Sequence, residues 1–372
     1  MNDVKIKILH VTFNMGIGGT EQVIRQIIEN SDVDRFTHEI LCIDGEIGPL
    51  GLALQEKGIH IENIQRQPGI DIKLLKFMRQ LLKKRKINVM HCHQYTPYFY
   101  GVLSASFTKT KVIFTEHGRF YPDIHNAKRR IINPLLLLAT DHVTAISKST
   151  ADAVAKYEYI QCKKVKVIYN GISDLKEHNV NKHELLKALN LSNGFRYIGT
   201  ISRLEPIKNQ SMMIDAFYRV KQQITDIKLI IIGDGALMAD LKQHAEAMEI
   251  ADDIVFTGFI DNPQKYINLF EIFLLSSFSE GASMTLLEAM SLSKPCIVTN
   301  VGGNPEVVVD NKTGFISPSN DVEKFASAII DLLENKNIRA ELGNSGRERY
   351  LKHFSVRQMA DKYESLYLEA IV

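Results

Sequence analysis

The sequence predicts an α/β protein made of two doubly wound, Rossmann-like halves that face each other across a cleft. Short β-branched runs alternate with helix-length amphipathic stretches, which is the pattern of repeated strand–helix–strand units in parallel sheets. This alternation breaks once, at a polar and irregular segment near residues 175–195, and then restarts. The length of 372 residues also suggests about two domains rather than one.

The first half contains seven strand-like runs, and most of them end in polar residues or glycine. Strands are predicted over 4–13, 37–44, 59–64, 87–93, 111–117, 141–147 and 165–172, with helices over 21–30, 49–58, 72–86, 98–107 and 148–157. Parallel strands connected by helices are usually covered on both faces. Residues 1–175 are therefore expected to form an N-terminal Rossmann-like domain.

The second half repeats the alternation after a linker that carries one short helix. Strands are predicted over 196–204, 227–235, 253–260, 272–277, 295–300 and 314–318, with helices over 211–223, 237–248, 262–268, 285–291 and from residue 322. Residues 190–355 are expected to form the second domain. The tail 354–372 has apolar residues at helical spacing and is expected to pack as a helix on a domain.

Composition indicates a globular protein of a reducing, cytoplasmic compartment. Four scattered cysteines form no C-x-x-C pair, which argues against a zinc ribbon or a disulfide scaffold. The N-terminus does not resemble a signal peptide, and the apolar run "PLLLLA" is much shorter than the ~20 residues of a membrane span. Residues 1–172 carry 24 Lys and Arg against 16 Asp and Glu, so the first half is basic and the remainder acidic. A basic half favours an anionic partner, such as nucleic acid, anionic lipid or a phosphorylated substrate.

A glycine loop, "NMGIGGTE", follows the first strand. Gly16 and Gly18 fit a dinucleotide fingerprint, but Glu21 occupies its third position, where a carboxylate disfavours a pyrophosphate. Asp44 follows the second strand and keeps an NAD-dependent oxidoreductase open as an alternative. With Gly19, the loop still allows backbone N–H groups to approach a ligand closely.

Polar residues also gather at the ends of two later strands of the first half. Strand alternation places His91 and His93 of "HCHQY" on one face, but a metal requires a third ligand. None is evident in the sequence, so no metal site is predicted. "TEHGRFYP" brings Glu116, His117 and Arg119 to a strand end, where a functional role for His117 is favoured over a structural one. Asp32 and Asp34 form a D-x-D that is interpreted as a turn rather than a metal motif.

Two cations follow the first strand of the second half, in "SRLEPIKNQ". Arg203 and Lys208 lie five residues apart around a proline, so a turn could direct a guanidinium fork and an ammonium at one pyrophosphate. They could also be unrelated surface charges. Gly233 in "IIIGDGAL" could bring backbone to a ligand or simply form a turn.

The stretch "SEGASMTLLEAM" holds Glu280 and Glu288 eight positions apart. Ser283 or Thr285 can cap the helix that follows, and Thr285 with Glu288 fits a capping box. Alternatively, the free N–H groups of the helix start bind a phosphate, Glu288 accepts hydrogen bonds from ribose hydroxyls, and Glu280 faces the next group of the ligand. This second interpretation describes a nucleotide-sugar.

At these residues the sequence resembles the retaining glycosyltransferases of family 4 (glycosyl transferases group 1), which have the GT-B fold. "SEGASMTLLEAMSLSKPCIVTNVGGNPEVV" resembles the family's E-x7-E signature and its P-x-I-x-T-x-x-G-G-x-x-E run, and "SRLEPIKNQ" resembles its R-x4-K phosphate element. "VIYNGI", "IIGDG" and "FTGFI" also fall in family order. The resemblance covers essentially the whole chain.

The resemblance implies roles for particular positions. Glu288 would bind the donor ribose, Glu280 would contact the transferred sugar, and Arg203 with Lys208 would neutralise the diphosphate. His117 would lie against the reaction centre, and the helix 356–372 would cross back to the first domain. The remaining positions would line the site: Gly16, Gly18, Gly19, Gly233, Phe259, Ile260, Gly281, Ala282, Ser283 and Met284 on the donor side, and His93, Tyr95, Glu116 and Arg119 on the acceptor side.

The resemblance further implies metal-independent transfer of a hexose-type sugar, with no cofactor and with UDP as the expected donor nucleotide. The acceptor would be a sugar or lipid-linked saccharide in cell-surface polysaccharide or glycolipid assembly, which admits peripheral contact with the inner face of the membrane. Where the family often has E-G-F-G-L-P, this chain has E-G-A-S-M-T, so the identity of the sugar is not carried over. A UDP-sugar epimerase of the same fold, an NAD-dependent oxidoreductase and a non-catalytic nucleotide-sugar-binding protein are the alternatives.

Overall fold

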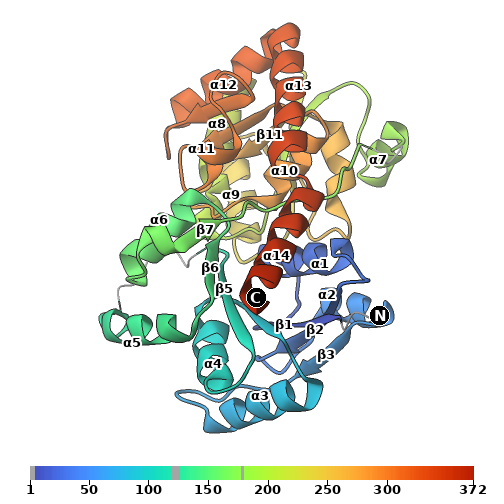
Figure 1. The fold of residues 1–372 in the computed structure, drawn as a ribbon. Helices are drawn as coiled ribbons and strands as arrows, with labels where there is room; N and C mark the ends of the chain where they lie inside the picture. The colour runs from blue at the N-terminus through green and yellow to red at the C-terminus, as the bar shows by residue number, and fades with distance from the viewer. Residues whose placement is uncertain (1–4, 119–125, 177–179) are drawn as a thin grey trace. The chain divides into compact units, whose positions relative to one another are not determined.

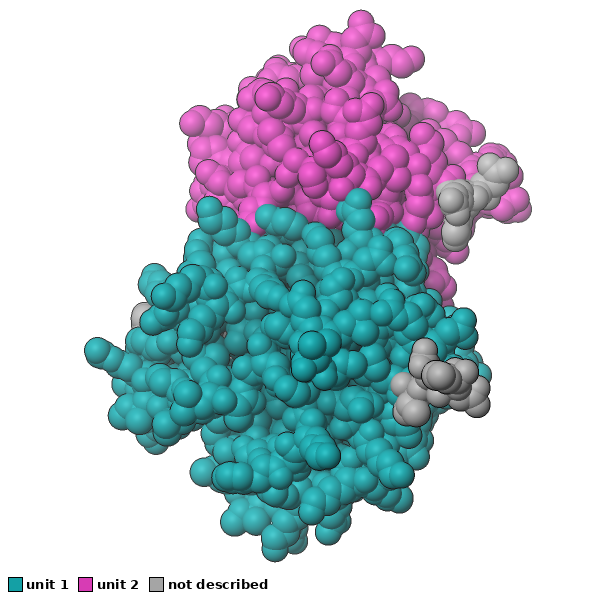
Figure 2. Space-filling view, in the orientation of Figure 1, with its two compact units in different colours: residues 1–173, 356–372 teal, residues 174–355 magenta. Residues whose placement is uncertain are grey.

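The computed structural model describes residues 5–118, 126–176 and 180–372, and it divides the chain into two compact units. Unit 1 comprises Met1–Ser173 and Val356–Val372, and unit 2 comprises Asp174–Ser355 (Figures 1 and 2). The C-terminal segment therefore packs with the first part of the chain, although the whole of unit 2 precedes it in sequence. Among the described residues, no helix is long and apolar enough to cross a membrane.

Unit 1 is built on a parallel sheet of seven strands in the order β3-β2-β1-β4-β5-β6-β7. Its strands are β1 Ile6–Thr12, β2 Phe36–Cys42, β3 His60–Asn63, β4 Val89–His93, β5 Lys111–Glu116, β6 His142–Ala145 and β7 Val165–Val167. Its α-helices are α1 Gly19–Asn30, α2 Pro49–Glu56, α3 Ile72–Arg85, α4 Tyr95–Ala105, α5 Arg129–Leu136, α6 Lys148–Tyr157 and α14 Val356–Ile371. Short 3-10 turns lie at Leu137–Ala139 and Cys162–Lys164.

The two faces of this sheet differ in polarity. One face presents apolar residues such as Leu9, Met90 and Phe114, which pack with side chains of α3 and α4 in one buried core cluster. Along the strands, alternate residues point to opposite faces. The other face accordingly carries His10 and His91, together with the apolar Ile40 that packs near α1. The helix α14 packs against α1 and against β4 and β5, so it covers the part of this face that holds histidines (Figure 1).

Unit 2 is built on a parallel sheet of six strands in the order β10-β9-β8-β11-β12-β13. Its strands are β8 Arg196–Ile201, β9 Ile227–Ile232, β10 Ile254–Phe256, β11 Phe270–Leu275, β12 Cys296–Thr299 and β13 Gly314–Ser317. Its α-helices are α7 Lys182–Ala188, α8 Gln210–Lys221, α9 Met238–Ala247, α10 Met284–Ser291, α11 Asn304–Val307, α12 Val322–Glu334 and α13 Lys336–His353, and 3-10 turns lie at Pro206–Lys208 (η3), Ala251–Asp253 and Pro263–Leu269. Strand side chains pack with α8 and α12 in one buried apolar cluster.

Several elements differ from those that the sequence predicts. The segment predicted as a helix over 262–268 is a 3-10 turn, and α4 begins at Tyr95 rather than at residue 98. The sequence analysis did not predict α5, which contains Pro134, or α11, and it did not separate α12 from α13. The D-x-D forms a turn before β2, in which the Asp34 amide donates to the Asp32 carboxylate (2.9 Å).

Candidate active site

The order of the strands in unit 2 creates a place for a ligand at the carboxyl edge of the sheet. The chain leaves β8 toward β9 on one side, whereas β11, on the other side of β8, leads to β12. The loops that follow β8 and β11 therefore diverge, and ligands of doubly wound sheets bind at such a switch point. These two loops contain Arg203, Lys208 and Glu280.

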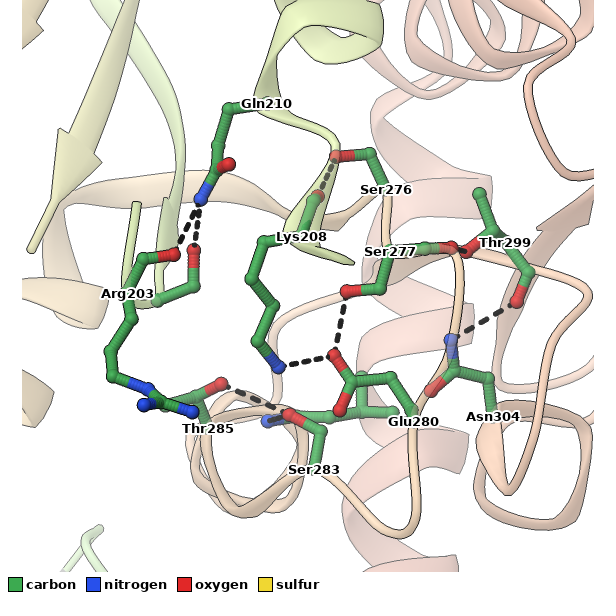
Figure 3. Close-up of polar contacts among 12 residues, drawn as sticks. Arg203, Lys208, Gln210, Ser276, Ser277, Glu280, Ser283, Thr285, Thr299 and Asn304 are labelled. Carbon is green, nitrogen blue, oxygen red and sulfur yellow. Dashed lines mark hydrogen bonds and ion pairs between the residues drawn. The ribbon is translucent and has the colours of Figure 1, made fainter. Parts of the chain in front are cut away.

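Backbone contacts fix the loop after β8. The Gln210 side chain donates to the Ser202 hydroxyl (3.0 Å) and to the Arg203 carbonyl (2.8 Å), as Figure 3 shows in part. Gly233 has a φ of +135°, and a Cβ atom there would lie 2.1 Å from the Ser202 carbonyl oxygen. A side chain at position 233 would clash with this loop, so the close packing of the two segments requires glycine there.

Hydrogen bonds also join the loop after β11 to the loop after β8. The Ser276 hydroxyl donates to the carbonyls of Lys208 (3.0 Å) and Asn209 (2.9 Å), and the Phe278 amide donates to the Ile207 carbonyl (2.8 Å). These hydrogen bonds tie the backbone of the loop after β8 to the loop after β11. They therefore fix the position of Lys208 relative to the β11 loop.

The centre of the site is an ion pair that the sequence analysis did not foresee. The Lys208 ammonium donates to Oε1 of Glu280 (2.7 Å), and the Ser277 hydroxyl donates to the same oxygen (2.6 Å; Figure 3). The side chain of Glu280 is only 7% exposed and that of Lys208 is 20% exposed. A partly buried ammonium at a loop junction is suited to hold an anion, and the carboxylate beside it can accept hydrogen bonds from hydroxyl groups.

Two consecutive glycines hold the backbone of Glu280. Gly302 has a φ of +51°, and a Cβ atom there would lie 1.8 Å from the Glu280 carbonyl oxygen. The Gly303 amide donates to that same oxygen (3.0 Å). Further along, the Thr299 hydroxyl donates to the Ser277 carbonyl (2.7 Å), and the side-chain amide of Asn304 donates to the Thr299 carbonyl (3.0 Å). Glycine is therefore needed at position 302 for this close backbone approach.

Helix α10 begins directly after this loop. Ser283 is its N-cap, and its hydroxyl accepts a hydrogen bond from the Leu286 amide (3.3 Å). The prediction of a capping box between Thr285 and Glu288 is wrong, because Thr285 is the second residue of the helix rather than its cap. Glu288 is half-buried and lies one turn inside the helix. The helix start, with Gly281 to Met284 leading into it, provides the positive end of a helix dipole.

Arg203 does not pair with the Glu280 carboxylate as Lys208 does. Its guanidinium contacts Glu205 (2.8 Å) and is 69% exposed, and Figure 3 shows the side chain extended toward Thr285. Exposed ion pairs contribute little to stability. The guanidinium can therefore exchange this carboxylate for a phosphate at small cost.

The predicted base-flanking residues lie at the same edge of the sheet, two strands from β8. Phe259 and Ile260 follow β10, and Phe259 is 60% exposed. The Gly258 carbonyl accepts a hydrogen bond from the Gly233 amide (3.1 Å), which links this segment to the end of β9. An exposed aromatic ring at this place is available to a planar ligand group.

In unit 1 the predicted residues also follow the ends of strands. Gly16, Gly18 and Gly19 lie between β1 and α1, and Gly18 is the N-cap residue of α1. The loop is held by the neighbouring segment, since the Met15 amide donates to the Ile47 carbonyl (2.8 Å). Glu116 ends β5 and is buried. Arg119 lies outside the described residues.

The Tyr95 side chain is held in place by two other residues of unit 1. Its hydroxyl donates to the Asn133 side chain (2.7 Å), and the Arg129 guanidinium lies 3.9 Å from the centre of its ring. Burial raises the pKa of Tyr95 to about 12, so the phenol stays neutral. Tyr95 also lines a cavity of about 280 Å³ with Arg66, Phe99, Lys128 and Ile132.

The histidines of unit 1 form a cluster that the sequence analysis predicted only in part. His93 accepts or donates hydrogen bonds at both ring nitrogens, to His10 (3.0 Å) and to His117 (2.8 Å). The expectation that His91 and His93 lack a third ligand is wrong, because a ring nitrogen of His10 lies within 4.8 Å of a ring nitrogen of each. Both ring nitrogens of His91 are already engaged, by the Tyr367 hydroxyl and the Thr115 hydroxyl. The absence of a metal in the reaction stays a prediction.

Two Rossmann-like units with their polar residues at the carboxyl edges define the GT-B class of glycosyltransferases. A model of glycosyl transferases group 1 matches residues 181–349, and a model of Glycosyltransferase Family 4 matches residues 17–174. The chain belongs to this glycosyltransferase family. An NAD-dependent oxidoreductase is thereby excluded.

Individual proteins are similar to this chain over nearly its whole length. The UDP-Gal:alpha-D-GlcNAc-diphosphoundecaprenol alpha-1,3-galactosyltransferase of Escherichia coli is 26% identical, over 99% of this chain and 98% of its own. A glycosyltransferase from Rickettsia africae ESF-5 has a similar structure, with a TM-score of 0.88, 19% identity and coverage of 99% of each chain. The Anabaena protein Alr3699/HepE, solved in complex with UDP, has a TM-score of 0.83 and 19% identity, covering 97% of this chain and 99% of its own.

Proposed function

We propose that the protein is a retaining glycosyltransferase that moves a hexose-type sugar from UDP to an acceptor in cell-surface polysaccharide or glycolipid assembly. The observation that carries this proposal is the Lys208–Glu280 pair at the switch point of unit 2, beside the start of α10. This arrangement brings together a cation, a helix N-terminus and a carboxylate that can accept hydrogen bonds from hydroxyl groups. They lie on two loops that are joined by hydrogen bonds. The cation and the helix N-terminus suit a diphosphate, and the carboxylate suits the hydroxyl groups of a sugar.

Each part of the donor has a matching group at this edge. Lys208, Arg203 and the amides from Gly281 to Met284 would hold the diphosphate, because two cations and the helix dipole offset its charge. Glu280 would accept hydrogen bonds from hydroxyls of the transferred sugar. Glu288, one turn inside α10, would accept those of the ribose, and the exposed ring of Phe259, with Ile260, would flank the base.

We favour UDP as the donor nucleotide because two similar proteins are described with UDP or a UDP-sugar. The E. coli relative uses UDP-Gal, and Alr3699/HepE has been solved with UDP and glucose. The stretch Ala282–Met284 departs from the usual family turn and lies next to Glu280, so we expect it to influence which sugar is accepted.

The proposed chemistry needs orientation and charge stabilisation rather than a protein nucleophile. The bond between the anomeric carbon and the diphosphate oxygen breaks, and the acceptor hydroxyl attacks from the same face. Its proton passes to the departing phosphate, which leaves with the bonding electron pair. Lys208 and Arg203 stabilise the negative charge that develops on this phosphate, which is why we propose that the reaction needs no metal.

Unit 1 would receive the acceptor. Its cavity beside Tyr95 combines the cations Arg66, Lys128 and Arg129 with aromatic and aliphatic side chains. This composition suits an anionic group attached to an apolar chain, and the E. coli relative acts on a sugar linked to diphosphoundecaprenol. We therefore propose a lipid-linked saccharide as acceptor, with the reaction at the inner face of the membrane.

Calorimetry on a Glu288 variant tests the donor assignment. We expect the wild-type chain to bind one or more UDP-sugars, and Glu288→Ala to weaken that binding at least tenfold, because two hydrogen bonds to a charged acceptor are lost. Glu271→Ala is the matched control, since Glu271 is a carboxylate at the opposite end of β11 that pairs with Arg339 (3.1 Å). Wild-type affinity in Glu288→Ala would contradict the assignment.

The stereochemical outcome is tested separately. The anomeric coupling constant in the proton NMR spectrum of the product is expected to match that of the donor sugar. An inverted product would overturn the retaining mechanism while leaving the donor site intact. Sugar turnover without any acceptor would point instead to the epimerase alternative.

A further inference from the structure

Helices α3, α4 and α5 of unit 1 cover one face of the sheet and carry no acidic residue. Their buried side chains belong to a single apolar cluster, and α5 lies beside α4 at the edge of the unit (Figure 1). Residues 72–115, which include α3 and α4, contain nine Lys and Arg and no Asp or Glu. Residues 126–140, which include α5, contain three Lys and Arg and again no Asp or Glu. This helical layer is therefore strongly basic.

The outward face of α5 is apolar. Asn133 and Leu136 are buried, whereas Ile131 and Leu135 are exposed, and so is Leu138 in the 3-10 turn that follows. Residues four and seven positions apart lie on the same side of a helix, so these three side chains form a row. Their exposed fractions lie between 64% and 85%. Since the outward face of a surface helix is normally polar, the composition of this face is unusual.

Phe107, at the end of α4, extends this row. Its side chain is fully exposed, and it lines a cavity of about 190 Å³ together with Leu138. Its φ of +62° lies in the left-handed region, which is unfavourable for a bulky side chain and easy for glycine. Neither backbone conformation nor burial explains a phenylalanine at this position. We call Phe107, Ile131, Leu135 and Leu138 the apolar row.

Exposed cations flank the apolar row. At about 100° per residue around the helix axis, Lys128 and Arg130 fall on opposite sides of Ile131, and both are exposed. Lys109, which is also exposed, follows Phe107 by two residues. Apolar side chains between cations are typical of segments that lie in the interface of an anionic membrane. The apolar groups enter the acyl region of such a membrane, and the cations meet the lipid phosphates.

We propose that the apolar row docks unit 1 on a bilayer of anionic phospholipids, with its four side chains in the acyl region and the surrounding cations on the lipid phosphates. The absence of carboxylates from residues 72–115 and 126–140 favours this partner, because no negative charge of these segments opposes an anionic surface. That the bilayer presents a lipid-linked acceptor to the enzyme rests on the proposed function. The docking itself does not depend on catalysis.

Protein partners fit the apolar row less well. In a symmetric dimer the same patch of both copies meets, so the cations around one row would lie against those around the other. A stable protein interface also takes about 20–30 residues from each partner, many more than the four side chains of the row. A bilayer requires neither a complementary shape nor a minimum area.

A single tryptophan tests insertion, since the chain contains none. With vesicles of phosphatidylglycerol and phosphatidylcholine, we expect the emission of Phe107→Trp to shift to shorter wavelength. Lipids brominated in their acyl chains should quench it. Leu52→Trp is the control, because Leu52 is an exposed apolar residue of α2, which packs with α1 and β3. Emission of Phe107→Trp that vesicles leave unchanged would overturn the proposal.

Substitution of the row measures its share of the binding. Ile131→Ser, Leu135→Ser and Leu138→Ser combined should lower the vesicle partition coefficient at least about 100-fold, because three side chains no longer enter the acyl region. Thermal unfolding should stay as in the wild type, since all three are exposed in the free chain. Val33→Ser with Leu52→Ser, at two exposed apolar positions elsewhere in unit 1, is the matched control. Binding of the triple variant equal to that of the wild type would contradict docking through the row.

The role of charge is tested with the same vesicles. Lys109→Gln combined with Arg130→Gln should weaken binding about 25-fold, or about fivefold for each cation removed. Vesicles of phosphatidylcholine alone should bind the wild type much more weakly. Equal binding to both kinds of vesicle would rule out the anionic surface as the partner. A wild type that does not bind vesicles but forms a dimer, which the triple serine variant does not form, would show a subunit interface instead.

Transfer assays separate the docking from the proposed function. The triple serine variant should transfer sugar to a water-soluble, short-chain acceptor like the wild type. On an acceptor embedded in anionic vesicles its rate should be at least about tenfold lower, because less enzyme is at the surface. Equal rates on the embedded acceptor would count against the docking. If the wild type transfers sugar to neither acceptor, the proposed function fails, whereas the vesicle measurements still decide whether the row docks on a bilayer.

Discussion

Replacement of Lys208 by methionine is expected to lower kcat by about 10²- to 10³-fold, the usual effect of removing one group that stabilises charge in a transition state. The ammonium lies at the loop junction and is the partly buried cation of the proposed donor site. Methionine keeps most of the length and apolar contacts of the lysine stem but removes its charge. Steady-state transfer from a radiolabelled UDP-sugar measures the change.

Lys221→Met is the matched control for this substitution. Lys221 is also partly buried and also pairs with a carboxylate, that of Asp253 (3.0 Å). It lies at the C-terminal end of α8, the end opposite to the one that follows Lys208. Its loss should change kcat less than twofold. A comparable loss of activity in both variants would mean that Lys208 acts through stability rather than through charge.

A double substitution separates the two roles of Lys208. Lys208→Met alone leaves the Glu280 carboxylate, 7% exposed, with Ser277 but without its ammonium, which is expected to cost about 2–3 kcal/mol of the free energy of unfolding. Adding Glu280→Gln removes the uncompensated charge. Thermal stability should then recover, whereas activity should not.

Acidification is expected to destabilise unit 1 strongly between pH 7.5 and 5.5. Burial lowers the pKa values of His10, His38, His91 and His93 in the folded state, whereas in the unfolded chain they titrate near 6.5. The unfolded state therefore binds more protons below pH 6.5, and stability falls as pH falls through that value. At pH 5.5 each such histidine costs about 1.4 kcal/mol, or about 6 kcal/mol for the four.

This loss is a large part of the ~5–15 kcal/mol that stabilises a typical domain. In a unit of this size it corresponds to a decrease in Tm of about 10–20 °C, which differential scanning calorimetry can follow. The loss for His38 continues down to about pH 4. Carboxylates contribute at lower pH, since the Arg347 guanidinium holds the pKa of Asp174 below its ordinary value.

Single substitutions identify the source of the acid effect. His38→Asn removes one of the four titrating groups and should reduce the decrease in Tm by about a quarter. His60→Asn changes an exposed histidine of β3 and should leave the pH dependence unaltered. A Tm that is constant from pH 7.5 to 5.5 in the wild type would mean that the buried histidines become protonated without cost.

The residues of the proposed donor site could be singled out from the sequence because their signals are local. Glu280 and Glu288 lie within one loop and the helix that follows it, and Arg203 and Lys208 follow a strongly apolar strand. The partner of Glu280 was not accessible, since 72 residues separate it from Lys208 and only the strand order brings their loops together. The sequence likewise does not reveal that Gly302 packs against the Glu280 carbonyl.

The histidine cluster of unit 1 shows a second limit. Alternation alone placed His91 and His93 on one face, but it said nothing of their neighbours, which depend on the order β2-β1-β4-β5 and on the register. Histidines at alternate positions of apolar strands, His10 in β1 and His38 in β2, were the available signal. They were overlooked because single histidines in strands are common.

Helix α5 was not predicted and helix α13 was not separated from α12, for different physical reasons. Helix α13 is polar around most of its circumference, so it lacks the apolar stripe that predicts a helix from its period. Helix α5 contains Pro134, a residue that usually argues against a helix interior. The two sheets, in contrast, were predicted well because buried parallel strands are nearly continuous apolar runs.

The C-terminal helix α14 has a consequence for biosynthesis. It supplies Tyr363 and Tyr367, which cover the histidines of unit 1, yet the whole of unit 2 is translated before it. At ribosomal rates of about 5–20 residues per second, the nascent first unit waits roughly 10–40 s for its last piece. A face of imidazoles and hydroxyls stays hydrated during that delay, whereas an apolar face of the same size would invite aggregation. The polar lining is thus compatible with a domain whose final helix is translated only after the whole of unit 2.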